Sequence, residues 1–367
     1  MSKIVIFTGS YPQIKNALYI ATHSCSDDPI TIAIPGNHDL FKFFQAINEK
    51  VFHNTINLIY LEPYRARRVT AKGLKKVFYV LPDIIGERRY LNEIFDKYFT
   101  GLKRAEIFFS SKCFCPYTFY LLKRLSKGNK LIHICDPSMD GRRVEKFTPT
   151  NIIDWASLII LKLVYGRGIA IGKIPYTKFP CMSDKFFNRE VDKVIDREER
   201  NEMMKDFDLS QYKIFDTGNY SVIYFDEGLM EASYTKIDKN TFSRELAEIF
   251  GIILKYFPEK EIACKYHPGY PGDKTMIKVG DVLPDFIPAE LLYNDNVKMY
   301  LSGFSLSIAN VEKGLAVSFA DLITFIDEKL KNQLREILIQ NGKSKILFPK
   351  SLDEFERILI DVKQQEK

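Results

Sequence analysis

The chain has 367 residues, of which 46% are hydrophobic, enough for about two domains with cores of their own. Its net charge of +6 suits an anionic partner such as a nucleotide, an acidic glycan or a phospholipid surface, and equally a solvated basic face. The six cysteines lack the paired spacing of a zinc site, so we expect reduced thiols and a cytoplasmic protein.

Strand-like and helical patterns alternate in the first half, which is typical of a parallel sheet with crossover helices. The chain opens on a strand pattern rather than a secretion signal. Predicted strands cover 3–9, 30–36, 56–62, 106–111 and 130–136. Predicted helices cover 14–24, 38–50, 87–104, 116–127 and 150–166.

The longest apolar run, residues 155–166, is interrupted by Lys162 and is too short to span a bilayer. A charged stretch at 184–207 carries no strand signal and is expected to close a first domain, residues 1–207. We therefore expect a soluble protein, or one held peripherally on the inner membrane.

The strand pattern restarts in a second domain, residues 208–367. Its predicted strands cover 221–227, 261–268, 297–303, 316–320 and 344–349, with a helix at 241–256. The sequence thus predicts an α/β fold with two Rossmann-like domains that face each other across a cleft. Ligands of open α/β sheets bind beyond the carboxyl ends of the strands, so candidate site residues are expected there.

A histidine and a proline stand at one such strand end. Pro268 biases the preceding residue to extended geometry and would hold His267 toward the cleft. An imidazole there can hydrogen-bond a phosphate or protonate a leaving group near neutral pH. Lys265 lies on the same face of the strand and would add positive charge, or be solvated. The alternative is that His-Pro is only a structural turn.

Two further motifs follow. Glu290 falls in the first turn of a helix predicted at 286–293, where a carboxylate either caps the helix or accepts hydrogen bonds from both hydroxyls of a ribose. Gly303 then turns a strand end toward Ser305 and Ser307 and another predicted helix. Hydroxyl and N–H groups at the start of a helix can bind a phosphate, although serines that only cap a helix would give the same sequence.

With these motifs in this order, the chain resembles the bacterial sialyltransferases of the two-domain GT-B fold, namely glycosyltransferase family 52 and the related capsular polysialyltransferases. Those enzymes carry a His-Pro motif at a strand end, then a Pro-x-Glu helix start, then a hydroxyl pair after a glycine. In this chain Leu306 separates the two serines. The opening stretch at 7–16 resembles the family's first strand and its glutamine-containing loop.

The resemblance implies inverting transfer of sialic acid from CMP-sialic acid to a hydroxyl of a bacterial surface glycan, lipooligosaccharide or capsule, without metal or cofactor. His267 would assist departure of the CMP phosphate. Ser305 and Ser307 would hold that phosphate, and Glu290 the ribose. The family also suggests a homodimer. The alternatives are a GT-B transferase that uses another CMP-activated nonulosonic acid or Kdo, and a non-catalytic two-lobed binding protein.

Inverting transfer needs a carboxylate that takes the acceptor's proton. Asp136 and Asp140 follow the last strand of the first domain, where the family's acidic-acidic-Gly motif would face the cleft. Asp226 belongs to a stretch that spells this motif but ends the first strand of the second domain. Place in the fold favours Asp136 and Asp140, whereas the match to the residues of the motif favours Asp226. An acidic turn is the alternative for each.

The first domain is expected to bind the acceptor. Gly9, Ser10 and Gln13 would contact the donor sugar, and no Gly-x-Gly-x-x-Gly follows, which disfavours a dinucleotide-dependent oxidoreductase. A basic aromatic stretch at 62–78 suits a phosphorylated glycan or the anionic inner leaflet, or is a solvated face, and no nucleic-acid module accompanies it. Its members are Tyr64, Arg65, Arg67, Arg68, Lys72, Lys75, Lys76 and Phe78.

Overall fold

The computed structural model divides the chain into two compact units, Met1–Asp208 and Leu209–Lys367. The sequence placed this division between residues 207 and 208. The structure describes residues 4–24, 30–72, 75–110, 116–135, 145–146, 148–166, 171–173, 181–182, 191–212, 214–226, 238–267, 279–325, 327–342 and 344–364.

The first unit is built on a six-stranded sheet in the order β3-β2-β1-β4-β5-β9, with all neighbours parallel. The five predicted strands are its first five, because each is an apolar run that a sheet covered on both faces can bury. The strands are β1 (Ile4–Phe7), β2 (Ile30–Pro35), β3 (Asn57–Leu61), β4 (Glu106–Phe109), β5 (Lys130–Ile134) and β9 (Lys193–Ile195). A small antiparallel sheet is made of β6 (Glu145–Lys146), β7 (Ile171–Lys173) and β8 (Cys181–Met182).

Strand β9 lies in the stretch at 184–207, where the sequence predicted none. It pairs with β5 at the sheet edge, and two of its three residues are exposed, so it has no apolar run to detect. The helices are α1 (Ile14–His23), α2 (His38–Lys50), α3 (Arg67–Thr70), α4 (Lys75–Phe99), α5 (Pro116–Leu125), α6 (Ile152–Tyr165) and α8 (Arg197–Met203).

Helix α4 begins twelve residues before the predicted start at 87, as the bounds Lys75–Phe99 show. Its first part carries apolar side chains on the exposed face as well as on the buried face, so no amphipathic period marks it as a helix. None of the described helices is both long and apolar enough to cross a membrane.

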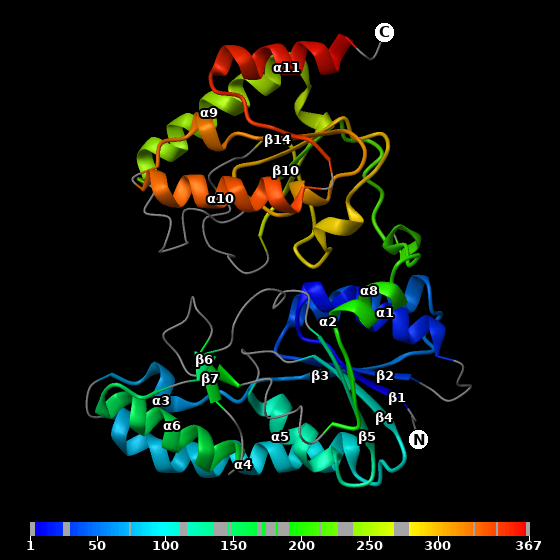
Figure 1. The fold of residues 1–367 in the computed structure, drawn as a ribbon, viewed down its shortest axis with the longest axis vertical. Helices are drawn as coiled ribbons and strands as arrows, with labels where there is room; N and C mark the ends of the chain where they lie inside the picture. The colour runs from blue at the N-terminus through cyan, green and yellow to red at the C-terminus, as the bar shows by residue number, and fades with distance from the viewer. Residues whose placement is uncertain are drawn as a thin grey trace. The chain divides into compact units, whose positions relative to one another are not determined.

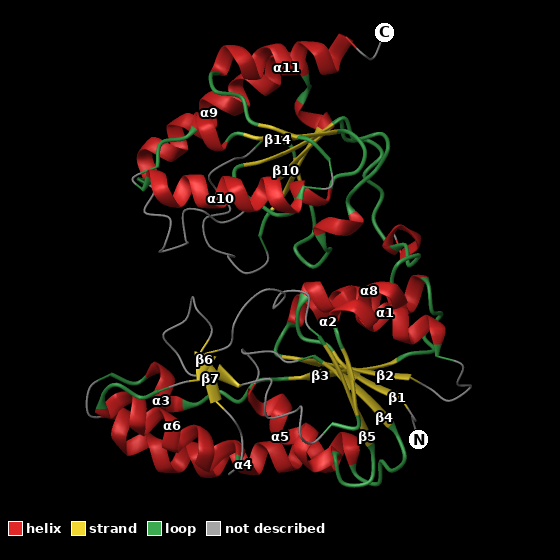
Figure 2. Ribbon diagram, in the orientation of Figure 1, coloured by secondary structure: helices red, strands yellow, loops and turns green. Residues whose placement is uncertain are grey.

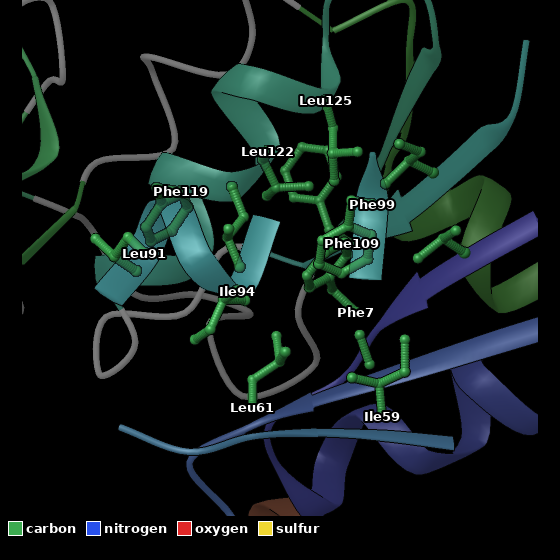
Figure 3. Close-up of a cluster of buried hydrophobic side chains, with 14 of the residues drawn as sticks. Phe7, Ile59, Leu61, Leu91, Ile94, Phe99, Phe109, Phe119, Leu122 and Leu125 are labelled. Atoms are coloured by element: carbon green, nitrogen blue, oxygen red, sulfur yellow. The ribbon is translucent and has the colours of Figure 1, made fainter. Parts of the chain in front are cut away.

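One cluster of the first unit's core lies between the sheet and helices α4 and α5. Figure 3 shows Phe7 and Phe109 of the sheet beside Phe99 of α4 and Leu122 of α5, all nearly fully buried. The rings of Phe7 and Phe99 lie 5.7 Å apart between centroids. Helix α6 joins the same cluster through Val164 and its neighbours.

The second unit repeats this plan with the strand order β12-β11-β10-β13-β14-β15, again all parallel. Figure 2 shows α10 on one side of this sheet and the packed pair α9 and α11 on the other. The strands are β10 (Val222–Phe225), β11 (Ile262–Lys265), β12 (Asp281–Val282), β13 (Met299–Ser302), β14 (Leu315–Ser318) and β15 (Ile346–Leu347). The helices are α9 (Lys239–Tyr256), α10 (Glu328–Asn341) and α11 (Leu352–Gln364).

Numbered along each unit, both sheets have the order 3-2-1-4-5-6 of the Rossmann fold. The predicted α/β class with two Rossmann-like units is therefore confirmed. In the second unit the strand order reverses between β10 and β13, and this reversal is where such sheets bind ligands.

Candidate functional site

Three neighbouring strands of the second unit, β11, β10 and β13, end at the point where the strand order reverses. Because they are parallel, their carboxyl ends meet at one edge of the sheet. Asp226 follows β10, His267 follows β11, and Gly303 follows β13. The Asp226 N–H donates to the Lys265 carbonyl at 2.9 Å, which continues the ladder to the end of these strands. The predicted residues of three separate strand ends thus share one edge.

Lys265 is the last residue of β11 and is buried, with 4% of its surface exposed. Its Nζ donates to the carbonyl oxygens of Tyr266 at 2.9 Å and of Asp285 at 3.2 Å. Those bonds fix the ammonium inside the strand end, so the alternative of a solvated lysine is wrong. Its charge acts on His267 and Glu290.

His267 stands just beyond Lys265 and is exposed. Protein atoms nevertheless surround it closely enough that desolvation, and then the positive charge of Lys265, lower the pKa of the imidazole. The lowered pKa favours the neutral imidazole, and a bound anion would favour its protonated form. Pro268, predicted to fix this histidine, lies outside the described residues.

Glu290 lies in a single 3₁₀ turn, Ala289–Leu291, and the α-helix predicted at 286–293 is wrong. The turn begins after Pro288, and the backbone then leaves it because the N–H of Asn294 donates to the hydroxyl of Tyr300 at 2.7 Å. Glu290 reaches solvent, yet burial raises the pKa of its carboxyl group, while its own N–H and the Lys265 charge act in the opposite direction. Lys265 therefore acts on both His267 and Glu290.

The serine turn after β13 is held by hydrogen bonds between side chains and backbone. The Ser305 N–H donates to Ser302 Oγ at 3.1 Å, and the Ser307 N–H donates to Ser305 Oγ at 3.2 Å. Only a short 3₁₀ turn, Ile308–Asn310, follows, so the predicted helix start is wrong there too. Such local bonds compete with helix formation. An anion at this turn would therefore depend on the serine hydroxyl groups and not on a helix dipole.

Gly303 is buried between this turn and β14, and its carbonyl accepts a hydrogen bond from the Ser318 hydroxyl. Ser318 also accepts from the N–H of Ala320 at 3.3 Å. Both serines next to the glycine, Ser302 and Ser318, are fully buried. The small residues here therefore build the backbone support of the turn, while Ser305 and Ser307 lie nearer to the surface.

Tyr293 connects the stretch that contains Glu290 to the serine turn, and it was not among the residues predicted from the sequence. Its hydroxyl donates to the Ser307 carbonyl at 2.6 Å. Burial, followed by the charge of Glu290, raises the pKa of this phenol well above its ordinary value, so it remains a donor. Its position three residues after Glu290 is the only signal in the sequence. The Tyr293 hydroxyl thus fixes the stretch that contains Glu290 to the serine turn.

Of the three candidate bases, Asp136 and Asp140 lie outside the described residues. Asp226 is partly buried at the end of β10, where its Oδ1 accepts a hydrogen bond from the Tyr224 hydroxyl at 3.3 Å. Its negative charge adds to burial in raising the pKa of Tyr266 to about 12. Asp226 is thus the candidate that the structure holds at the same sheet edge as His267.

The loop after β1 belongs to the first unit and lies at the corresponding reversal of its own sheet, between β1 and β4. The Gly9 N–H donates to Oε1 of the buried Gln13 at 2.9 Å, so this amide oxygen shapes the loop. The hydroxyls of Thr8 and Ser10 are buried and have no hydrogen-bond partner within the described part of the chain. The predicted contact of Gly9, Ser10 and Gln13 with a donor sugar stays a prediction.

The chain matches no protein-family model and no curated protein. Solved structures that it resembles include Arabidopsis thaliana UGT89C1 complexed with quercetin, with 9% identity, a TM-score of 0.40, and coverage of 99% of this chain and 90% of the other. A UDP-glucosyltransferase from Polygonum tinctorium capable of glucosylating indoxyl has 11% identity, a TM-score of 0.41 and coverage of 99% and 92%. The glycotransferase of kitacinnamycin has 9% identity, a TM-score of 0.36 and coverage of 98% and 90%. At such values the likeness carries no argument about what this chain does.

Proposed function

We propose that the chain is an inverting, metal-independent glycosyltransferase of the GT-B type, which moves sialic acid from CMP-sialic acid to a hydroxyl of a bacterial surface glycan. The observation that carries the proposal is that His267 and the serine turn follow neighbouring parallel strands at one carboxyl edge, and that Tyr293, three residues after Glu290, donates to the Ser307 carbonyl of that turn. A nucleoside monophosphate presents a phosphate and a ribose diol, and the edge offers a cation, hydroxyls and a carboxyl group.

In this reading the serine turn and Lys265 hold the phosphate. The hydroxyl groups of Ser305 and Ser307 can donate to phosphate oxygens, and the buried ammonium supplies charge in a medium where charge acts strongly. Glu290 accepts hydrogen bonds from both ribose hydroxyls, and both of its oxygens are acceptors when the group is ionised. Protonation of Glu290 should therefore weaken donor binding at low pH. Because burial raises the pKa of Glu290, this weakening should begin at a higher pH than for an ordinary glutamate.

The transfer step breaks the bond between the sugar's anomeric carbon and the phosphate oxygen, and CMP leaves with the electron pair. His267 donates a hydrogen bond or a proton to that phosphate. The acceptor oxygen forms the new bond at the anomeric carbon, and its proton passes to a carboxylate. Asp136, Asp140 and Asp226 remain the candidates for this base. The phosphate's own charge would offset the effects that lower the pKa of His267.

The test is release of CMP from CMP-sialic acid in the presence of a galactoside acceptor, and none without the chain. Replacing His267 by alanine should lower kcat by about 10²–10⁴-fold, the usual range for a lost general acid. His23→Ala is the matched control, because His23 is an exposed histidine at the end of α1 in the other unit. Full activity in the His267 variant would remove the mechanism.

Further experiments distinguish this function from another CMP-sugar donor and from a non-catalytic binding protein. CMP-Kdo in place of CMP-sialic acid tests whether another CMP-activated sugar is the donor, since the phosphate and ribose contacts would be alike. A binding protein would retain CMP affinity and release no product from either donor. Single replacements of Asp136, Asp140 and Asp226 by asparagine identify the base as the one whose loss abolishes turnover but not CMP binding.

A further inference from the structure

Helix α6 carries a stripe of large apolar side chains on its exposed face. Ile152, Trp155, Ile159 and Leu163 follow the spacing of one helix face and are between 51% and 84% exposed. The opposite face already packs into the core of the first unit through Ile160, Val164 and their neighbours. The core therefore does not account for the exposed stripe.

Helix α4, which packs beside α6 (Figure 1), carries a second such stripe. Phe78, Leu81 and Ile85 are between 53% and 77% exposed and lie in the first half of the helix. Isolated exposed apolar residues are normal, but clusters of this size on neighbouring helices mark an interaction site. The α4–α6 face comprises Phe78, Leu81, Ile85, Ile152, Trp155, Ile159 and Leu163.

The charges around the α4–α6 face are predominantly positive. Exposed basic residues on α3, α4, α6 and the loops beside α3 are Arg65, Arg67, Lys72, Lys75, Arg88, Arg89 and Lys162. The carboxylates of the same region are fewer. Asp83 and Glu87 are buried and pair with Arg68, while Glu62 lies 3.5 Å from Arg65 and Asp96 lies 3.5 Å from Arg124. The other acidic side chains on these helices are Glu93 and Asp154.

We propose that the α4–α6 face binds the surface of an anionic lipid bilayer. Apolar side chains with a tryptophan, flanked by lysine and arginine, suit the boundary between acyl chains and negatively charged headgroups. Helix α6 has 14 residues and a length of about 21 Å, less than the roughly 30 Å of a bilayer core, so it would lie along the surface.

A second copy of the chain fits this face less well. In a two-fold symmetric dimer the same patch meets itself, so the surrounding lysine and arginine side chains would lie opposite like charges. An anionic bilayer covers the same apolar side chains and complements these charges. This inference is independent of the proposed transfer reaction, because nothing in it depends on the second unit.

The chain contains a single tryptophan, Trp155, and it lies on the α4–α6 face. Its fluorescence in the full chain therefore reports directly on this surface. With vesicles containing about one third phosphatidylglycerol, we expect a blue shift, quenching by brominated acyl chains and co-sedimentation. Pure phosphatidylcholine vesicles should give much less binding, and high salt should weaken binding to the anionic vesicles.

Matched variants locate the contact. Ile152→Ser with Ile159→Ser should lower the partition coefficient at least about tenfold by removing two buried apolar groups. The control is Ile339→Ser on α10, where an isoleucine is similarly exposed, at 57%. Equal losses in the double variant and the control would overturn the proposal.

Charge variants test the lipid specificity. Each of Arg67→Ser and Lys75→Ser should weaken binding to anionic vesicles about fivefold and leave binding to neutral vesicles unchanged. Lys205→Ser, an exposed lysine at the end of α8, is the control. An unchanged Trp155 spectrum on anionic vesicles would refute the proposal. So would a lipid-independent blue shift that grows with protein concentration and disappears in the isoleucine double variant, because a protein partner would then cover the face.

Discussion

Replacing Arg68 by methionine should destabilise the first unit by about 3–5 kcal/mol, the usual effect of removing one partner from a buried ion pair. Arg68 Nη2 lies 2.9 Å from Glu87 Oε2, and Nη1 lies 3.6 Å from Asp83 Oδ2. The side chain of Asp83 is 1% exposed and that of Glu87 is 8% exposed. Tyr165 of α6 donates its hydroxyl to the other oxygen of Glu87.

The magnitude follows from what methionine leaves behind. It replaces the aliphatic part of arginine but supplies no donor, so two buried carboxylates lose their common counter-charge. Arg68→Lys should have an intermediate effect, because a single ammonium cannot reach two carboxylates as the planar guanidinium does. Since the network joins α3, α4 and α6, its loss should be transmitted to all three helices.

Urea unfolding followed by Trp155 fluorescence measures this effect, because the only tryptophan lies in the first unit. With a slope of about 3 kcal/mol per molar urea for a unit of this size, the midpoint should fall by roughly 1–2 M. The control is Lys130→Met, which breaks a half-exposed pair with Glu106 at 2.8 Å and should leave the midpoint nearly unchanged. If Arg68→Met and Lys130→Met shift the midpoint equally, the buried network does not stabilise the unit as argued.

The second unit offers three further tests. Lys265→Met should raise the pKa of His267, because the lysine charge lowers it. The kcat/KM for the donor, which falls when His267 loses its proton, should then fall at a higher pH than in the wild type. An unchanged pH profile would contradict this effect of Lys265 on His267. CMP affinity should decrease as the pH falls through the raised pKa of Glu290, and Glu290→Gln should lose that part of the dependence in calorimetric titrations, while the titration of CMP itself is common to both proteins. Tyr293→Phe should weaken CMP binding about five- to tenfold through loss of the bond to the Ser307 carbonyl, and an unchanged Kd would show that the serine turn needs no such support.

The strands at the centre of both sheets could be predicted from the sequence because their burial on two faces requires continuous apolar runs. The edge strands β3 and β15 also carry apolar residues and were predicted, whereas the edge strands β9 and β12 do not form such runs and were missed. Strand β9 keeps a single buried residue, Ile195, and strand β12 is only Asp281–Val282, both exposed. Pairing to a neighbour already in the sheet, and not local composition, determines these two elements.

The two helices predicted at the site failed because side chains and distant groups take the backbone donors. Ser302 and Ser305 accept the N–H groups that a helix after Gly303 would use, and the Tyr300 hydroxyl accepts the N–H of Asn294. Such bonds depend on residues that meet only in the folded chain. The motif residues could be found from their order in the sequence, whereas Tyr293 could not.

Lys265 shows why the site depends on more than the motifs. A buried ammonium must keep hydrogen-bond partners, because desolvation of a charge costs several kcal/mol. Two of the groups that accept from Lys265 are the carbonyl oxygens of Tyr266 and Asp285. The Lys265 charge adds to burial in lowering the pKa of His267, and at Glu290 it opposes burial, which raises the pKa of that carboxyl group. An anionic phosphate at this edge would therefore be stabilised by charge as well as by hydroxyl groups, and its arrival would reverse the effect of Lys265 on the imidazole.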